Sequence, residues 1–328
     1  MAGQSDKAGR AKSGERIAKI MARAGLCSRR EAEAWIAAGR VAVNGSVIAS
    51  PALDVNARDR VTVDGKPLPQ RERTRLFLYH KPRGLLTSHA DARGRETIFA
   101  ALPKGLPRLI SVGRLDLNTE GLLLLTNDGG LARTLELPAT GWLRRYRVRA
   151  HGRVRQEALD RLREGITIDR IRYGAIEARL EREQGSNSWL TFAMREGKNR
   201  EVKNVLGHLG LAVNRLIRIS FGPFQLGDLP EGAIEEVRTR VLRDQLSERI
   251  VALAGADFSA PIAQVAAGEP EAFGRREGSP AELVSLKPAS PERKPRPRKS
   301  RSRDAERLGE PELARRAARR HRDNRRGR

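Results

Sequence analysis

Apolar residues at helical spacing mark the start of the first compact unit, which we place at residues 15–66. Between residues 16 and 24, apolar side chains recur every three or four positions and basic side chains take the opposite side. This pattern predicts a short amphipathic helix that ends at Gly25. The apolar side consists of Ile17, Ile20, Met21 and Ala24, and the basic side of Arg16, Lys19 and Arg23.

A second helix and two hairpins are predicted to complete this unit. Ser28 and Glu31 have the spacing of a capping box, so the helix should run over residues 29–38, stop at Gly39 and present Arg29 and Arg30 in its first turn. The strings VAVNGSVI and VTVDGKPL predict hairpins, because Asn-Gly and Asp-Gly supply the positive φ pair of a tight turn.

A larger unit is predicted at residues 76–249, after a linker at residues 67–75 that is rich in proline and charge. Its strand-like runs are LFLYH, RLISV, GLLLLTN, RYRVRA, SWLTFAM and VNRLIRISF, with helical patterns around residues 130–137, 154–163 and 199–209. Strands outnumber helices, and no glycine-rich loop follows a strand in a βαβ unit. The expected fold class is therefore α+β with an antiparallel-rich sheet, and not a Rossmann fold.

The net charge of +24, from 64 basic and 40 acidic residues, indicates a polyanionic partner. Nucleic acid fits best. A membrane surface is the competing polyanion, but the sequence has no run of about 18 apolar residues. The N-terminus lacks the apolar core of a signal peptide, so a cytoplasmic location is expected. A single cysteine, Cys27, fits that compartment, and no spacing of histidine and cysteine predicts a metal site.

Much of this charge lies near the C-terminus. Residues 291–328 contain 16 lysines and arginines against six acidic residues, and no Phe, Trp or Tyr. We therefore predict a disordered basic tail at residues 250–328, as well as a disordered N-terminus at residues 1–14. The run ELARRAARRHR is either a solvated electrostatic tether or a segment that becomes helical on RNA.

Asp116 is the candidate for chemistry. It follows a predicted strand that ends at Val112 and precedes the apolar run of residues 122–125, so it should emerge at the edge of the sheet and face a cleft. Arg114 lies two residues before it. Physical reasoning alone leaves two alternatives open, a catalytic carboxylate and an ordinary turn-forming aspartate.

Several motifs in order resemble one enzyme family. GRLDLNTEGLLLLTNDG looks like the catalytic motif of pseudouridine synthases of the RsuA/RluB/RluE/RluF type, and most like its RluB-type members. HKPRGLLTS, RRYRV, EGKNREVKNVLGHLG and RLIRISFGPFQLGDLPEG match further motifs of that family. SRREAEAWIAAGRVAVNG resembles the S-four RNA-binding domain of ribosomal proteins. Together the likeness covers about residues 15–240.

The resemblance implies a cofactor-free isomerisation of a uridine within RNA. The glycosidic bond breaks, the uracil rotates, and its carbon-5 rejoins the ribose. Asp116 would act as nucleophile or base on a flipped-out uridine, Tyr146 would stack on the base, and Arg114 would fill the vacated position. For RNA contacts we expect Arg16, Lys19, Arg23, Arg29, Arg30, Lys81, Arg114, Lys198, Asn199 and Arg200.

One position departs from the family pattern. EGKNREVKN has Glu201, Val202 and Lys203 where relatives more often have Gln-Val-Arg, and that arginine is the expected ion-pair partner of the catalytic aspartate. Lys203 keeps the charge without the bidentate fork, and Arg200 is the substitute candidate. Leu216 or Ile217 is expected to form the apolar wall beside the uracil.

Two other functions are compatible with parts of the chain. A non-catalytic RNA-binding assembly factor would be signalled by an altered residue at position 116, where the aspartate is present. An S-four-containing methyltransferase should show a glycine-rich loop after its first catalytic strand, where this chain has KPRGLLTS. The expected substrate is large-subunit ribosomal RNA or a pre-ribosomal particle, with small-subunit RNA as the runner-up, and the expected state is a monomer.

Overall fold

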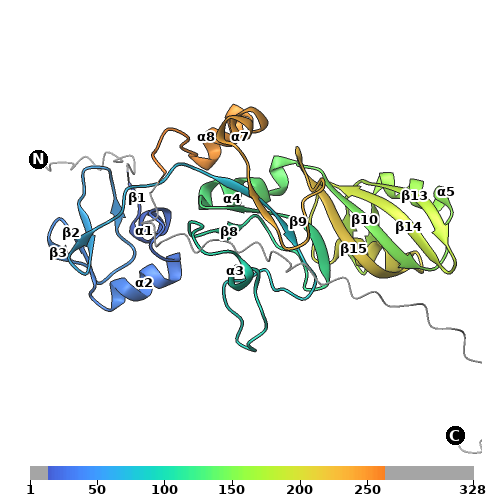
Figure 1. The fold of residues 1–328 in the computed structure, drawn as a ribbon, viewed down its shortest axis with the longest axis horizontal. Helices are drawn as coiled ribbons and strands as arrows, with labels where there is room; N and C mark the ends of the chain where they lie inside the picture. Colours follow the sequence, from blue (N-terminus) through green and yellow to red (C-terminus); the bar gives the residue numbers. More distant parts are fainter. Residues whose placement is uncertain (1–13, 263–328) are drawn as a thin grey trace, which may run out of the picture. The chain divides into compact units, whose positions relative to one another are not determined.

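A computed structural model describes residues 14–262 of the 328-residue chain, coloured in Figure 1. The predicted disorder at residues 1–14 falls, except for its last residue, outside this range. Most of the predicted basic tail lies outside it as well. No helix among the described residues is long and apolar enough to span a membrane.

The N-terminal unit is built as the local signals predict. Helix α1 spans Ile17–Arg23 and α2 spans Arg29–Ala37. The capping box is formed, since the Ser28 hydroxyl accepts from the Glu31 amide at 3.1 Å and the Glu31 carboxylate accepts from the Ser28 amide at 2.6 Å. Both helices pack on a core that includes Met21, Ile36 and Val41.

Both predicted hairpins are confirmed in the small sheet of this unit. Strands β2 (Val41–Val43) and β3 (Ser46–Val47) are joined by Asn44 and Gly45, and β5 (Val61–Val63) and β6 (Lys66–Pro67) by Asp64 and Gly65. All four turn residues have positive φ, as a tight turn between twisted strands requires. The sheet order is β3-β2-β5-β6, and the short β1 (Glu15–Arg16) and β4 (Asp54–Val55) form a separate pair.

A nine-stranded sheet forms the second unit, in the order β13-β14-β10-β15-β9-β7-β17, with β8 added on β9 and β16 on β15. Every pairing is antiparallel except that of β9 with β15. The expected antiparallel-rich α+β class is therefore confirmed. The strands are β7 (Leu76–Lys81), β8 (Ile110–Ser111), β9 (Thr119–Thr126), β10 (Arg144–His151), β13 (Ile176–Gln184), β14 (Asn187–Met194), β15 (Ala212–Phe221), β16 (Phe224–Gln225) and β17 (Ile234–Glu236).

The strands of this unit that the sequence did not predict are short or polar. β13 reads IEARLEREQ and alternates only weakly, and the hairpin of β11 (Ile166–Ile168) and β12 (Ile171–Tyr173) is short. β17 is also short and acidic. Such segments become strands because a neighbouring strand supplies hydrogen-bond partners, which is tertiary information absent from local periodicity.

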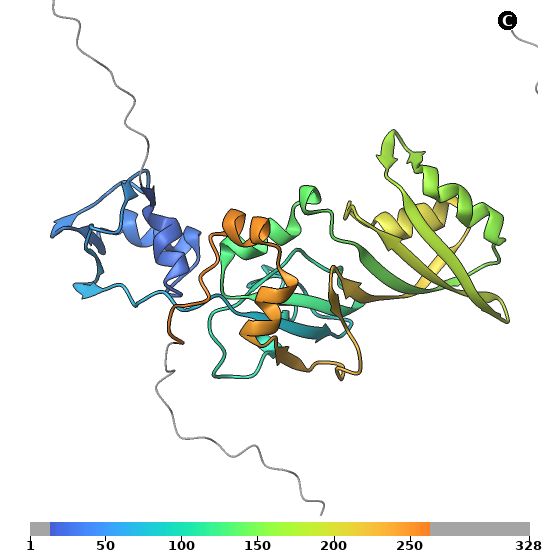
Figure 2. The same ribbon diagram turned by 90° about the horizontal axis from the view of Figure 1, so that it is seen from above.

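Helices cover both faces of the sheet, and the core on one face is larger than the core on the other. On one face α3 (Ile98–Ala101), α5 (Gln156–Asp160), the 3₁₀ turn η2 (Arg161–Glu164) and α6 (Glu201–His208) bury the larger core. On the other face α4 (Gly129–Glu136), α7 (Thr239–Gln245) and α8 (Glu248–Ala254) cover β7, β9 and the end of β15, while η1 (Pro138–Thr140) follows α4. Figure 2 shows α5 and α6, green-yellow and yellow, on one side of the long strands.

The predicted boundary between residues 249 and 250 is wrong. Ser247 caps α8, which continues to Ala254 and buries Ile250 and Ala254 against α4. Beyond the helix, the carbonyl of Asp257 accepts from the Thr74 amide at 2.6 Å. The folded domain therefore extends past residue 249, because a short amphipathic helix without aromatic residues still finds an apolar surface to bury.

The end of the predicted linker is also anchored. Arg71 and Thr74 both bind the buried carboxylate of Asp128, at 2.9 and 2.8 Å. Asp128 in turn caps α4 by accepting from the Gly130 amide at 2.7 Å. These contacts attach residues 71–74 to the second unit.

Candidate active site

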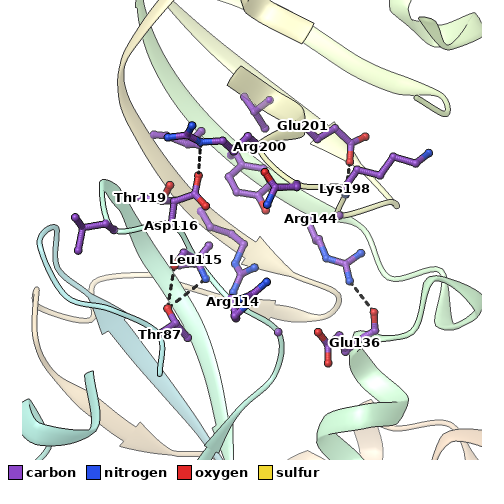
Figure 3. A pocket seen from close by; sticks show the side chains of 18 of the residues that line it. Thr87, Arg114, Leu115, Asp116, Thr119, Glu136, Arg144, Lys198, Arg200 and Glu201 are labelled. Carbon is purple, nitrogen blue, oxygen red and sulfur yellow. Dashed lines mark hydrogen bonds and ion pairs between the residues drawn. The ribbon is translucent and has the colours of Figure 1, made fainter. Parts of the chain in front are cut away.

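A pocket of about 770 Å³ lies beside the turn that carries Asp116 (Figure 3). Its floor is the face of β10 and β15 on which the larger core packs, and its walls come from residues 86–95, 112–119 and 194–203. Asp116 lies in the turn that leads into β9, and both β9 and its neighbour β15 are interior strands of the sheet. Asp116 thus emerges where an interior strand begins, and the expected cleft is present.

Asp116 is held in a turn directly before β9, where its carbonyl accepts from the Thr119 amide at 2.9 Å. Its side chain is 40% exposed and has two cations nearby. Lys203 Nζ is 3.7 Å and Arg200 Nε 3.8 Å from Asp116 Oδ2. Both expected partners of Asp116 are thus brought together at the pocket.

Helix α6 positions the two cations differently. Lys203 lies in its first turn and its side chain is 24% exposed, whereas the Arg200 side chain is 63% exposed. Arg200 is the N-cap residue and has φ 52° and ψ 26°, a left-handed conformation that is unusual for arginine. Lys203 is therefore the more restrained of the two cations.

The first motif, residues 80–88, holds the turn of Asp116 through hydrogen bonds to the neighbouring residues of that turn. The Thr87 hydroxyl donates to the Leu115 carbonyl at 2.9 Å and accepts from the Leu115 amide at 3.3 Å. The Gly84 amide donates to the Leu117 carbonyl at 2.9 Å. These bonds hold the residues on either side of Asp116, which gives HKPRGLLTS a physical connection to GRLD.

Lys81 belongs to the same framework, and its predicted contact with RNA is wrong. Its side chain is fully buried, and Nζ donates to the carbonyls of Pro82 at 2.9 Å, Thr119 at 3.1 Å and Leu117 at 3.4 Å. Burial lowers the pKa of Lys81 to about 8, against the opposing effect of the Asp116 and Glu120 carboxylates. Sequence alone could not separate this lysine from a solvated one.

Replacing Lys81 with methionine should change how stability depends on pH. Since the folded state lowers the pKa of Lys81 from 10.5 to about 8, the unfolded state binds more protons between these pH values. Burial of the lysine therefore destabilises the folded state less as the pH rises. The free energy of unfolding of the wild type, relative to Lys81→Met, should rise by up to about 3 kcal/mol over this interval. Urea denaturation at a series of pH values measures it, and a constant difference would contradict the assignment.

Tyr146 and Leu216 form the floor of the pocket. Tyr146 on β10 is 7% exposed and faces the larger core, so it serves that core as well as the pocket. Leu216 on β15 is buried and lines the pocket, while Ile217 points to the other face of the sheet. Leu216 is thus the apolar wall residue of the two that were expected.

The remaining predicted residues of the second unit also border the pocket. Arg114, Lys198 and Asn199 line it, and Figure 3 shows Arg114 and Lys198 from opposite walls. Lys198 Nζ already donates to the carbonyl of Arg172 at 2.6 Å and to the carboxylate of Glu196. Its charge is therefore already partly neutralised within the protein.

The basic residues predicted in the N-terminal unit fall into two groups. Arg16 pairs with Asp54, while Lys19 and Arg23 both pair with Glu15. Arg29 and Arg30 are exposed at the start of α2 and make no ion pair within residues 14–262. Of the five predicted residues, only the two at the N-terminus of α2 therefore keep their charge free of an ion pair within the described part of the chain.

Three buried charged residues of the pocket were not predicted. Arg144 donates to the carbonyls of Arg195 and Glu136, and burial lowers its pKa. Glu201 accepts from the Lys198 amide at 2.8 Å, and burial raises its pKa. Arg218 donates to the Leu122 carbonyl at 2.7 Å. The sequence could have indicated them, because each charged residue occupies a position where the alternation of its strand or the spacing of its helix predicts a buried apolar residue.

The comparisons with known proteins agree with this geometry. A family model described as RNA pseudouridylate synthase matches residues 75–208, and an S4 domain model matches residues 15–61. A Rickettsia felis protein named "Uncharacterized RNA pseudouridine synthase" is 45% identical over 228 residues, which cover 70% of this chain and 99% of that protein. "Ribosomal large subunit pseudouridine synthase B" of Pseudomonas aeruginosa is 40% identical over 253 residues, covering 74% of this chain and 65% of that protein.

A solved structure is similar as well. It is described as a crystal structure of pseudouridylate synthase and has 26% sequence identity with this chain. The superposition has a TM-score of 0.50 and covers 70% of this chain and 99% of the solved one. The resemblance seen in the motifs is thereby confirmed, and so is the enzymatic nature of the chain. With its S-four domain, its synthase domain and these relatives, the chain belongs to the RNA pseudouridine synthase family.

Proposed function

We propose that this enzyme converts one uridine of large-subunit ribosomal RNA into pseudouridine, with Asp116 as the catalytic carboxylate. The observation that carries the proposal is the position of Asp116, at a pocket about 770 Å³ in size and within 4 Å of two cations. Relatives named for the large subunit, at 40–41% identity, support the choice of substrate.

The reaction needs a uridine that has left its helix. A stacked base cannot reach a carboxylate in a pocket, so the target must be flipped out, at a cost of a few kcal/mol. Tyr146 would then stack on the uracil beside Leu216 at the floor of the pocket. Arg114, on the wall opposite Lys198, would fill the position in the RNA that the uracil has left. Asp116 would act as nucleophile or base while the N1–C1′ bond breaks and the C5–C1′ bond forms; the C5 proton is lost and N1 gains one.

The substrate proposal is tested by mapping pseudouridines in both ribosomal RNAs of cells that lack the protein. We expect one large-subunit pseudouridine to disappear and to return when the wild-type gene is restored. Loss of a small-subunit pseudouridine instead would reject the proposed substrate. An unchanged map would reject ribosomal RNA as the target.

Lys203 is proposed to orient and stabilise the Asp116 carboxylate. Replacing Lys203 with methionine should lower the single-turnover rate constant about tenfold or more, because the less exposed cation is lost, while Lys203→Arg should keep most of the rate. Arg200→Met is the matched control, since its side chain is more exposed and its charge more strongly screened. Single-turnover kinetics on the substrate RNA measure the effect, and a larger loss for Arg200→Met would exchange the two roles.

The working state proposed for the enzyme is a cytoplasmic monomer that needs no cofactor and acts on ribosomal RNA or a pre-ribosomal particle. The assignment rests on the proposed substrate and on the resemblance to the family.

A further inference from the structure

The long strands of the catalytic sheet carry a dense group of arginines on the face turned away from the pocket. Along β10, Tyr146 and Val148 are buried in the larger core, so the alternating residues Arg145, Arg147 and Arg149 point to the other face. Arg145 and Arg147 are exposed. We call the following six residues the arginine face: Arg145, Arg147, Arg149, Arg179, Arg182 and Arg215.

Strand register arranges these side chains in rows across the sheet. In one row Arg182 of β13, Trp189 of β14, Arg149 of β10 and Arg215 of β15 are direct neighbours. The next row contains Arg179, Thr191 and Arg147. Neighbours in a row have Cβ atoms about 5 Å apart, so the guanidinium groups share one surface.

Trp189 lies at the centre of this surface. The guanidinium carbon of Arg147 is 4.9 Å from the centroid of its ring, and that of Arg182 is 5.8 Å from it. The indole Nε1 donates to the Gln184 side chain at 3.3 Å. An aromatic ring flanked by cations combines a stacking surface with positive charge, the two features that proteins use to hold nucleic acid strands.

Acidic residues neutralise only part of the arginine face. Glu181 pairs with Arg147 at 3.1 Å, and Glu120 pairs with Arg215 at 2.8 Å. Within residues 14–262 the other four arginines make no ion pair. Arg149 lies directly opposite Arg215, and its Nε is buried without a hydrogen-bond partner.

This arrangement costs stability, since like charges on neighbouring strands repel each other and a buried donor without a partner is unfavourable. Positions that violate a local packing rule without internal compensation are typical of binding surfaces.

Among the described residues, no helix covers this surface, because the helices pack elsewhere. Leu159 of α5, Leu162 of η2 and Val205 of α6 are all buried in the core on the pocket side of the sheet. The core on the opposite side contains no residue of β13 or β14. A partner can therefore reach the arginine face directly.

We propose that the arginine face binds phosphates of the substrate RNA outside the segment that carries the target uridine. The proposal rests on the proposed ribosomal RNA substrate. An RNA strand in the pocket lies on the Tyr146 side of the sheet and cannot at the same time lie on the opposite side, so the bound phosphates belong to a second segment of a large folded RNA. Arginine suits this role because its planar fork matches phosphate oxygens.

The test compares two double variants of the full chain on two RNAs. Arg145→Gln/Arg182→Gln removes two exposed arginines of the arginine face that make no ion pair. Arg161→Gln/Arg163→Gln makes the same change in net charge on η2, whose residues pack on the pocket side. The RNAs are full-length large-subunit ribosomal RNA and a short stem-loop containing the target uridine found by mapping.

We expect Arg145→Gln/Arg182→Gln to raise KM about tenfold on full-length RNA, with kcat unchanged and the stem-loop converted at the wild-type rate. The slope of log binding constant against log salt concentration should fall by about two on the long RNA, because two phosphate contacts are lost. The control variant should behave as the wild type on both RNAs.

Other outcomes would overturn the proposal. Equal losses in both variants would indicate an effect of net charge, and a loss on the stem-loop would indicate a disturbed active site. If Arg145→Gln/Arg182→Gln is fully active on naked RNA but not on ribosomal particles, the arginine face binds a ribosomal protein and not RNA. If the wild type converts neither RNA, the proposed substrate fails instead.

Discussion

Replacing Asp116 with asparagine is expected to abolish pseudouridine formation, with a rate loss of at least about 10³-fold. The amide keeps nearly the same shape, but it replaces one accepting oxygen with a donating NH2 group and can act neither as a nucleophile nor as a base. The carboxylate is partly exposed at the pocket and its turn is held mainly through backbone atoms, so the substitution should leave the fold intact. Single-turnover conversion of the substrate RNA measures the loss.

RNA binding provides the control for this experiment. Asp116→Asn removes a negative charge next to Lys203 and Arg200, so affinity for the polyanionic substrate should be equal to or higher than that of the wild type. A variant that binds RNA normally and retains more than a tenth of the wild-type rate would show that another group performs the chemistry.

Gly121→Ala is expected to destabilise the catalytic domain strongly. Gly121 has φ +100°, and a Cβ there would lie 2.3 Å from the Arg218 carbonyl oxygen on the neighbouring strand. These residues form part of the parallel contact between β9 and β15, in the middle of the sheet. Overpacking and backbone strain together should cost at least about 3 kcal/mol of unfolding free energy, measured by urea denaturation.

Gly185→Ala separates the two causes of that loss. Gly185 also has a positive φ of +61°, but an added Cβ there would meet no atom within 4 Å. Only the conformational cost of about 1–2 kcal/mol should remain. If both variants lose the same stability, the close approach of β15 to Gly121 does not limit the packing of the sheet.

Local sequence signals determined the elements whose stabilising contacts are themselves local. The Ser28–Glu31 capping box and the Asn44-Gly45 turn are closed by residues within a few positions of one another. The apolar run of β9 is buried on both faces, and its composition alone predicts a strand. The motif around Asp116 identified the family because its residues are contiguous in the chain and can be compared without knowledge of the fold.

Tertiary structure decided the environment of each charged side chain. Lys81 and Lys203 look alike in the sequence, yet one is fully buried among backbone carbonyls and the other faces Asp116. Arg147 and Arg144 are close in the same strand and face opposite sides of the sheet. The position of α8 depends on the surface offered by α4, which lies more than a hundred residues earlier in the chain.

The physical reason is that periodicity records which residues prefer burial but not what they are buried against. The sequence therefore predicted the first two helices, the tight turns and the fold class of this protein, and it singled out Asp116 as the candidate for chemistry. Whether an arginine or lysine supports a turn, faces the pocket or covers an open sheet was decided only when strands distant in the chain were paired, since strand register sets the neighbours of each charge.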